Sequence, residues 1–143
     1  MHTVQQVLEQ KTHNNVISVA PDDTVFTAIQ TMADNHIGAV LVMEGKRLTG
    51  IFSERDYARE IILKGRASHD TPVREIMSID VITAIPEDRV RGSLSVMTDK
   101  RIRHLPVVNG DEVIGVISIG DLVKDVISDQ QATIEQLENY IRG

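Results

Sequence analysis

The sequence lacks cysteine and tryptophan, and aromatic residues make up only 3% of its 143 residues. Without cysteine there can be no disulfide, no thiol nucleophile and no thiolate metal site. The core must therefore be built from aliphatic side chains. Long apolar runs are also missing, since runs such as 39–43 fall far short of the roughly 20 residues that a membrane span needs. The N-terminal segment MHTVQQVLEQK has neither the basic start nor the apolar middle of a signal peptide. We expect a soluble, cytoplasmic protein.

Excess positive charge and catalytic motifs are absent too. The formal net charge is −6, whereas a general nucleic-acid binder shows a basic excess. The five histidines show no metal-ligand spacing, and the sequence contains no P-loop, GxGxxG or GxSxG. Such motifs are what phosphate, dinucleotide and acyl-transfer chemistry need. The sequence therefore predicts a protein that is not an enzyme and has no metal site and no catalytic cofactor.

What the sequence does contain is an internal repeat. Shifting the chain by 65 positions aligns residues 16–62 with residues 81–127 without a gap, and fourteen of the 47 pairs are identical. The clearest match is the heptad GIFSERD at 50–56, which returns as GVISIGD at 115–121. Repeats of this kind indicate a duplicated structural unit. We divide the chain into a first repeat, 1–71, and a second repeat with a C-terminal helical extension, 72–143.

Each copy has the same predicted order of elements. A short strand (Val16–Val19; Val81–Ala84) precedes a Pro-acidic turn, an amphipathic helix, two further strands and a second helix that begins after the heptad serine. Short leading helices are expected at Val4–Glu9 and Val73–Met77. A strand–helix–strand crossover requires a parallel pair, and the hairpin adds an antiparallel strand. The predicted fold class is mixed α/β, with two pseudo-symmetric halves. Each half is a three-stranded sheet covered by helices on one face, and the halves pack sheet to sheet with two related clefts.

The heptad serine and aspartate have two interpretations. Ser53 with Asp56, and Ser118 with Asp121, stand where a strand ends and a helix begins, so each pair could form a capping box. Aspartate is one methylene shorter than the glutamate usual at that place. Alternatively, the hydroxyl donates to a phosphate at the helix start and the carboxylate accepts from the two hydroxyls of a ribose. The two interpretations are compatible.

Together these features resemble the cystathionine β-synthase (CBS) domain, and the tandem is similar to a stand-alone CBS pair, or Bateman module. The resemblance covers about residues 3–128. It is carried by VISVAPDDTV at 16–25, VITAIPEDRV at 81–90, RHLPVV at 103–108 and both heptads. It implies that adenosine nucleotides bind in clefts between the copies, with AMP first and ADP, ATP, NAD(H) or S-adenosylmethionine as other ligands.

The resemblance also implies roles for individual residues. The heptad aspartates would hold the ribose, the heptad serines would lie by the phosphate, and residues of the first and middle strands would line the adenine pocket. A basic segment at 100–104 in the second copy has no basic counterpart in the first. It is either a solvated helix end or a source of phosphate ligands, arginine binding through its fork. The predicted nucleotide-binding residues are Ser18, Ala39, Ser53, Asp56, Thr83, Arg101, Arg103, His104, Leu105, Pro106, Ser118 and Asp121.

The last segment, 121–143, continues as a helical pattern with an apolar stripe at Ile127, Ile134, Leu137 and Ile141. Such a stripe has to pack on something. The stripe covers either its own module or a second subunit. The resemblance to CBS pairs, which commonly dimerise, implies a homodimer. We expect, in addition, an effector protein that receives the signal, with no nucleic-acid or membrane partner. Ligand binding would shift the population of relative orientations of the two halves. The alternative is a structural dimerisation module without a physiological ligand.

Overall fold

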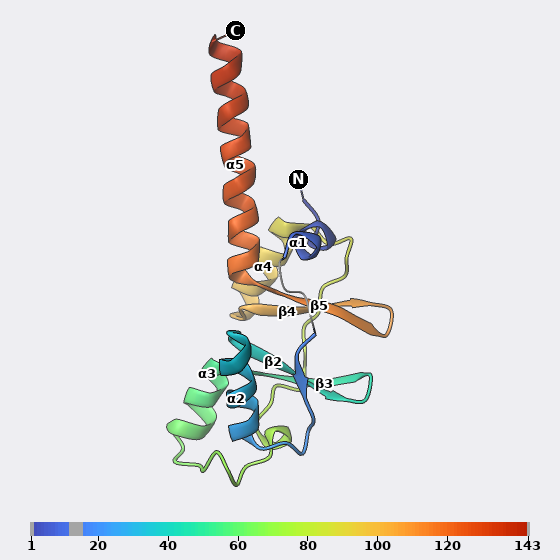
Figure 1. The fold of residues 1–143 in the computed structure, drawn as a ribbon, viewed down its shortest axis with the longest axis vertical. Coiled ribbons are helices and arrows are strands. Elements are labelled where there is room, and N and C mark those ends of the chain that lie inside the picture. The colour runs from blue at the N-terminus through green and yellow to red at the C-terminus, as the bar shows by residue number, and fades with distance from the viewer. Residues whose placement is uncertain (1, 12–15, 143) are drawn as a thin grey trace. The chain divides into compact units, whose positions relative to one another are not determined.

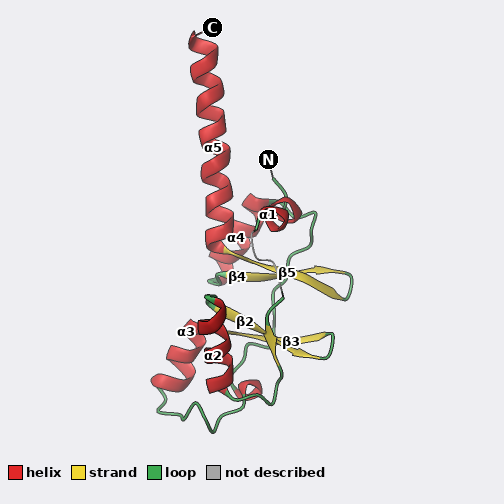
Figure 2. Ribbon diagram, in the orientation of Figure 1, coloured by secondary structure: helices red, strands yellow, loops and turns green. Residues whose placement is uncertain are grey.

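The computed structural model describes residues 2–11 and 16–142 (Figure 1). The described residues fall into two compact units. Unit 1 lies within 1–14, 83–109 and 114–143, and unit 2 lies within 15–82 and 110–113. Each unit combines helices with a small sheet (Figure 2). The predicted mixed α/β class is confirmed.

Unit 2 contains a three-stranded mixed sheet in the order β1-β2-β3. Strand β1 (Ser18–Val19) pairs in parallel with β2 (Ala39–Glu44), and β2 pairs antiparallel with β3 (Arg47–Ser53). Because side chains alternate along a strand, one face of the sheet presents Val19, Val40, Val42 and Phe52. These belong to the hydrophobic core of unit 2, together with residues of α2.

The helices of unit 2 begin at polar caps. Helix α2 (Val25–Asn35) starts after Thr24, whose side chain accepts from the backbone N–H of Thr27, and its apolar residues Val25, Ala28 and Met32 are buried. It ends at His36 in the left-handed conformation (φ 54°). Helix α3 (Glu54–Tyr57) follows β3 directly and continues as a π-helical turn, η1 (Ala58–Ile62).

Unit 1 repeats this order with one strand fewer. Helix α4 (Val90–Lys100) is followed by β4 (His104–Asn109), β5 (Glu112–Ser118) and the long α5 (Ile119–Arg142). The predicted strand at Val81–Ala84 is reduced to one parallel bridge between Ala84 and Val107. Local bonds limit it on both sides: the N–H of Val81 bonds the carbonyl of Ile79, and the N–H of Ile85 bonds the Asp88 carboxylate. The second sheet therefore has two strands.

The leading segment of each sequence repeat packs on the other repeat. Helix α1 (Val4–Gln10) belongs to unit 1, where the N–H groups of Val4 and Gln5 bond the carbonyls of Asp88 and Pro86. The 3₁₀ turn η2 (Val73–Glu75), shorter than the predicted helix, belongs to unit 2. There Val73 and Arg74 make the matching bonds to Asp23 and Pro21. Compact units and sequence repeats thus divide the chain differently.

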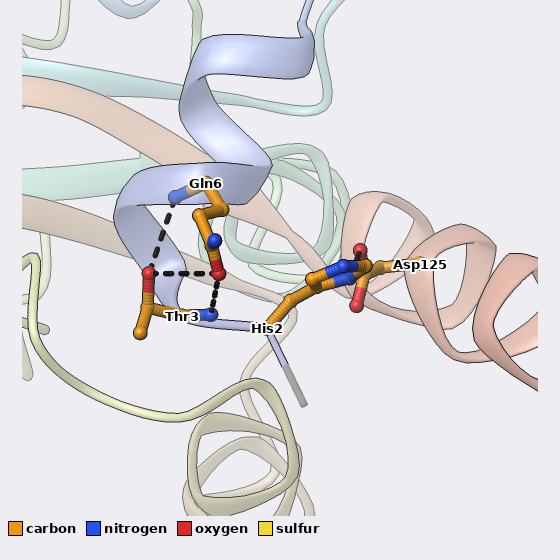
Figure 3. A network of polar contacts seen from close by, with 4 residues as sticks. All are labelled: His2, Thr3, Gln6 and Asp125. Atoms are coloured by element: carbon orange, nitrogen blue, oxygen red, sulfur yellow. Dashed lines mark hydrogen bonds and ion pairs between the residues drawn. The ribbon is translucent and has the colours of Figure 1, made fainter.

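Side chains also fix α1 within unit 1. Thr3 and Gln6 form a capping box, with the Gln6 N–H bonding Thr3 Oγ1 at 3.3 Å and the Thr3 N–H bonding Gln6 Oε1 at 2.9 Å (Figure 3). His2 Nδ1 lies 2.6 Å from Asp125 Oδ1 of α5. The Asp125 side chain is buried, and a buried carboxylate needs such a partner. His2 therefore holds the segment before α1 against α5.

The repeated heptad glycines make room for these leading segments. A Cβ atom at Gly115 would lie 2.9 Å from Leu8 Cδ2, and one at Gly50 would lie 2.5 Å from Met77 Sδ and 3.0 Å from the Ser78 carbonyl. Next to Gly50, Ile51 and Ser78 exchange two backbone hydrogen bonds. The glycine is thus required by packing between segments of the same unit.

Candidate functional site

Both heptads form the same local structure at the end of a strand. In unit 2, Ser53 Oγ accepts from the Asp56 N–H at 3.1 Å, and the Ser53 N–H bonds Asp56 Oδ2 at 2.9 Å. In unit 1, the matching distances between Ser118 and Asp121 are 3.1 Å and 2.8 Å. The capping box is therefore present in both copies. Aspartate completes the return bond despite its shorter side chain.

The capping boxes leave part of each residue available. Only Oδ2 of each aspartate accepts the return bond, and each serine Oγ acts as an acceptor. The second carboxylate oxygen and the hydroxyl hydrogen take no part in the cap. All four side chains are partly exposed. Capping therefore fixes the orientation of these groups while leaving each aspartate with an acceptor and each serine with a donor for a ligand.

The copies differ at Lys11, which the sequence analysis missed. Lys11 Nζ lies 2.9 Å from Asp121 Oδ2 and donates to the carbonyl of Val116 at 2.8 Å. Burial raises the pKa of Asp121, but the Ser118 N–H and the Lys11 ammonium lower it by more, so this pKa lies below the ordinary value. The leading segments align with an offset of 69, which pairs Val4 with Val73 and Lys11 with Asp80. That alignment could have revealed the asymmetry.

The lowered pKa of Asp121 predicts how stability depends on pH. A carboxyl whose pKa is lower in the folded state stabilises fully above its unfolded value, near 4, and that contribution is lost as pH falls through the folded value. We expect the free energy of unfolding to fall more steeply between about pH 5 and 2.5 in the wild type than in Asp121→Asn. The difference should be about 1 kcal/mol or less because the ion pair is partly exposed. Urea unfolding across this range measures it.

Lys11→Met is the second arm of this experiment, because it removes the cation and leaves the Asp121 carboxylate in place. Its pH dependence should be shallower than that of the wild type. Parallel curves for the wild type and both variants would contradict the role of the ion pair.

In unit 2, three predicted site residues lie on one face of the sheet. Ala39 pairs directly with Ser53, and Ser18 pairs with Leu41, two residues along β2 from Ala39. Alternation puts all of these on the face opposite the Val40 and Phe52 side chains. Ser18 is exposed and Ala39 is buried. The structure thus brings Ser18, Ala39 and Ser53 together at one end of this sheet, with Asp56 just beyond.

In unit 1, the basic segment lies against the start of α5. The N–H of Ile119 bonds the carbonyl of Arg103 at 2.9 Å, which puts Arg103 beside the heptad serine in the chain fold. The equivalent bond in unit 2 joins Glu54 to Gly38, so only unit 1 has an arginine at this place. Arg103 is exposed, and His104 follows as the first residue of β4.

The remaining predicted residues have clear structural positions. Arg101 is the C-cap of α4, in the left-handed conformation (φ 57°) that more often selects glycine. Lys100 and Arg101 thus lie at an exposed helix end. Leu105 and Pro106 are buried in β4, and Thr83 is exposed beside the Ala84 bridge. Their roles toward a ligand stay predictions.

Among residues 2–11 and 16–142, no group of three or more His, Asp or Glu side chains is placed to hold a metal ion. None of the described helices has the length and apolar content that a membrane crossing requires. A pocket of about 300 Å³ in unit 1 is lined by Val7, Gln10, Lys11, Asp121, Lys124, Asp125 and Ser128.

Comparison with known proteins agrees with this geometry. Residues 4–63 and 73–128 each match the CBS domain. The mitochondrial CBS domain-containing protein CBSX3 of Arabidopsis thaliana is 42% identical over 127 residues, which are 85% of this chain and 62% of that protein. The CBS domain-containing protein YhcV of Bacillus subtilis is 31% identical over 117 residues, 82% of this chain and 83% of that protein. The chain therefore spans less than two thirds of the length of the first of these relatives.

Solved structures give the same result. A protein with CBS domains from Burkholderia ambifaria superposes with a TM-score of 0.87 at 45% identity, covering 90% of this chain and 96% of that one. A CBS-domain containing protein from Agrobacterium tumefaciens gives 0.82 at 32% identity, covering 87% and 98%. Two repeats, each with a capped serine–aspartate heptad, define a CBS pair, which is a regulatory module. This chain belongs to the CBS domain family.

Proposed function

We propose that this CBS pair senses an adenosine-containing ligand and passes the ligand state to a partner. The observation that carries the proposal is the state of the two heptads. Each aspartate is oriented by its cap and keeps one carboxylate oxygen outside it. Carboxylate oxygens accept from ribose hydroxyls, and a serine hydroxyl at a helix start donates to phosphate. The CBS pair of protein MJ0100, 21% identical to this chain, is described in complex with 5′-methylthioadenosine and S-adenosyl-L-methionine.

In this proposal the ligand binds at the two heptads. AMP is the first candidate, with ADP, ATP, NAD(H) and S-adenosylmethionine as others. Asp56 and Asp121 bind ribose, and Ser53 and Ser118 lie by the phosphate. The base is lined from the first strand by Ser18 and Thr83, and from the middle strands by Ala39 and Leu105, with Pro106 next to Leu105. Arg101, Arg103 or His104 pairs with the phosphate at one site. The module acts without catalysis, in the cytoplasm, as a homodimer that contacts an effector protein.

A thermal-shift screen tests the proposal. A ligand at 100 times its Kd stabilises the folded state by about 2.7 kcal/mol, which for a chain of this size raises Tm by roughly 5–10 °C. We expect a rise with at least one adenine nucleotide and no rise with the matching pyrimidine nucleotide. Asp56→Asn and Asp121→Asn keep an oxygen for the cap but lose the second acceptor, so each should remove part of the rise. The ligand-free Tm of Asp56→Asn should change little, whereas that of Asp121→Asn should fall slightly because its ion pair with Lys11 is lost.

The second candidate function is a structural dimerisation module. It is favoured by the capping boxes themselves, because they give Ser53, Asp56, Ser118 and Asp121 a structural role without any ligand. The same screen separates the two functions. If no nucleotide changes Tm while the protein is folded, the sensor proposal is wrong and the structural module stands.

A further inference from the structure

Helix α5 continues well beyond the part of unit 1 that covers it. It runs from Ile119 to Arg142, and at 1.5 Å per residue it is about 36 Å long. Its first turns pack with α1 and α4, whereas residues 127–142 are all exposed. An isolated helix of 16 residues is only marginally stable in water. The exposed part therefore needs a partner surface.

The exposed part presents a narrow apolar line, which we name the tail stripe. Its members recur at alternating intervals of four and three residues. The tail stripe consists of Val123, Ile127, Gln130, Ile134, Leu137 and Ile141. Its apolar side chains remain 42% to 82% exposed. Strict alternation of this kind is the a/d pattern of a coiled-coil seam, with a at Ile127, Ile134 and Ile141.

We propose that the tail stripe binds the tail stripe of a second copy of this chain in an antiparallel coiled coil. This inference deepens the homodimer of the proposed function by naming its surface, and it is independent of ligand binding. The antiparallel alignment places Val123 opposite Ile141 of the second copy and Ile127 opposite Leu137 of the second copy. Two-fold symmetry makes each layer occur twice. Gln130 is the one polar member of the tail stripe, and it faces Ile134 of the second copy.

Charge selects this alignment over the parallel one. In the antiparallel pair, e positions face e positions, so Lys124 lies beside Glu138 of the second copy, and this ion pair occurs twice. In a parallel pair, g positions face e positions. The g positions are Val126, Thr133 and Tyr140, which carry no charge and leave Lys124 and Glu138 without partners across the seam.

A membrane surface is a poor occupant for the same stripe. Helices that lie on membranes carry lysine and arginine on their polar face. Between residues 127 and 142 the charged side chains are Asp129, Glu135, Glu138 and Arg142, a net negative set. Anionic lipids would repel it, whereas a second copy offers Lys124.

The first experiment measures the oligomeric state of the whole chain by sedimentation equilibrium. The wild type should be a dimer. Ile134→Asp should raise the dimer Kd at least roughly 100-fold, because two unpaired carboxylates would be buried. Gln136→Asp, which introduces the same negative charge outside the tail stripe, should leave the dimer Kd unchanged. A monomeric wild type, or a dimer that Ile134→Asp leaves intact, overturns the proposal. Nucleotide shifts of Tm on the same variants show separately whether ligand binding survives.

The second experiment determines the direction of the helices. Because the chain has no cysteine, Ile127→Cys and Leu137→Cys chains can be oxidised alone or mixed, one of them carrying a size tag. The antiparallel seam predicts a disulfide only in the mixture, since residue 127 faces residue 137. Disulfides in each variant alone would show a parallel seam and contradict the alignment.

Charge reversal gives an independent readout of the same alignment. Lys124→Glu and Glu138→Lys should each weaken the dimer by roughly 5- to 30-fold, because two ion pairs become repulsive contacts. The double variant K124E/E138K should restore wild-type affinity. Additive losses in the double variant would exclude the pairing of these two residues.

Discussion

Replacing Val4 with aspartate is expected to destabilise unit 1 by about 3–5 kcal/mol, although Val4 lies at the very start of the described chain. The Val4 side chain is fully buried and its N–H bonds the carbonyl of Asp88 at 2.8 Å. The change removes apolar contacts and places an unpaired carboxylate in the core. Since native stabilities are only about 5–15 kcal/mol, much of unit 1 should unfold. Urea unfolding followed by circular dichroism measures the loss.

Two matched variants make this prediction specific. Gln5→Asp, one residue further along on the exposed face of α1, should change stability by less than about 0.5 kcal/mol. Val73→Asp should have an effect of similar size to Val4→Asp, since Val73 is equally buried in unit 2. If Val4→Asp behaved like Gln5→Asp, helix α1 would not be part of the core of unit 1.

The sequence predicts the fold because its signals are local and doubled. The strand, turn, helix and hairpin patterns each appear twice, 65 residues apart, and hydrophobic periodicity located α2, β2, β3, α4, β4 and β5 to within a residue or two. The prediction of a third strand in the second sheet was wrong because the N–H groups of Val81 and Ile85 bond to Ile79 and Asp88, close by in the chain. Backbone geometry decides whether an N–H bonds locally or pairs with a neighbouring strand, and the pattern of apolar residues does not predict that geometry.

The candidate site was predicted less completely, for a related physical reason. The serine and aspartate of each heptad act within four residues, so their spacing alone indicated the cap. Lys11 acts across a separation of more than 100 residues, and only the folding of α1 onto unit 1 brings its Nζ to Asp121. The heptad glycines show the same limit, because the residues that approach them, Leu8 and Met77, lie outside the repeat alignment that revealed the glycines.

Arg103 provides the prediction with the largest expected effect on binding. Its backbone carbonyl is held at the start of α5 by the bond from the Ile119 N–H, and its side chain is exposed. If a ligand phosphate binds there, the guanidinium donates to it in charge-assisted hydrogen bonds worth about 1.5–3 kcal/mol. Arg103→Ala should therefore weaken AMP binding by roughly 10- to 100-fold. Adenosine binding should change less than about twofold.

Calorimetric titrations with both ligands separate a phosphate contact from a structural effect. Adenosine has the same base and ribose as AMP, so any damage to the rest of the site would weaken both ligands equally. Arg91→Ala removes an exposed arginine from α4 of the same unit and controls for the general loss of positive charge, which acts weakly through solvent and is screened by salt. Equal losses for AMP and adenosine would exclude a phosphate contact. A selective loss of AMP would assign the positive charge of the second repeat to recognition of the phosphate, and would explain why the first repeat can carry glycine at the equivalent place.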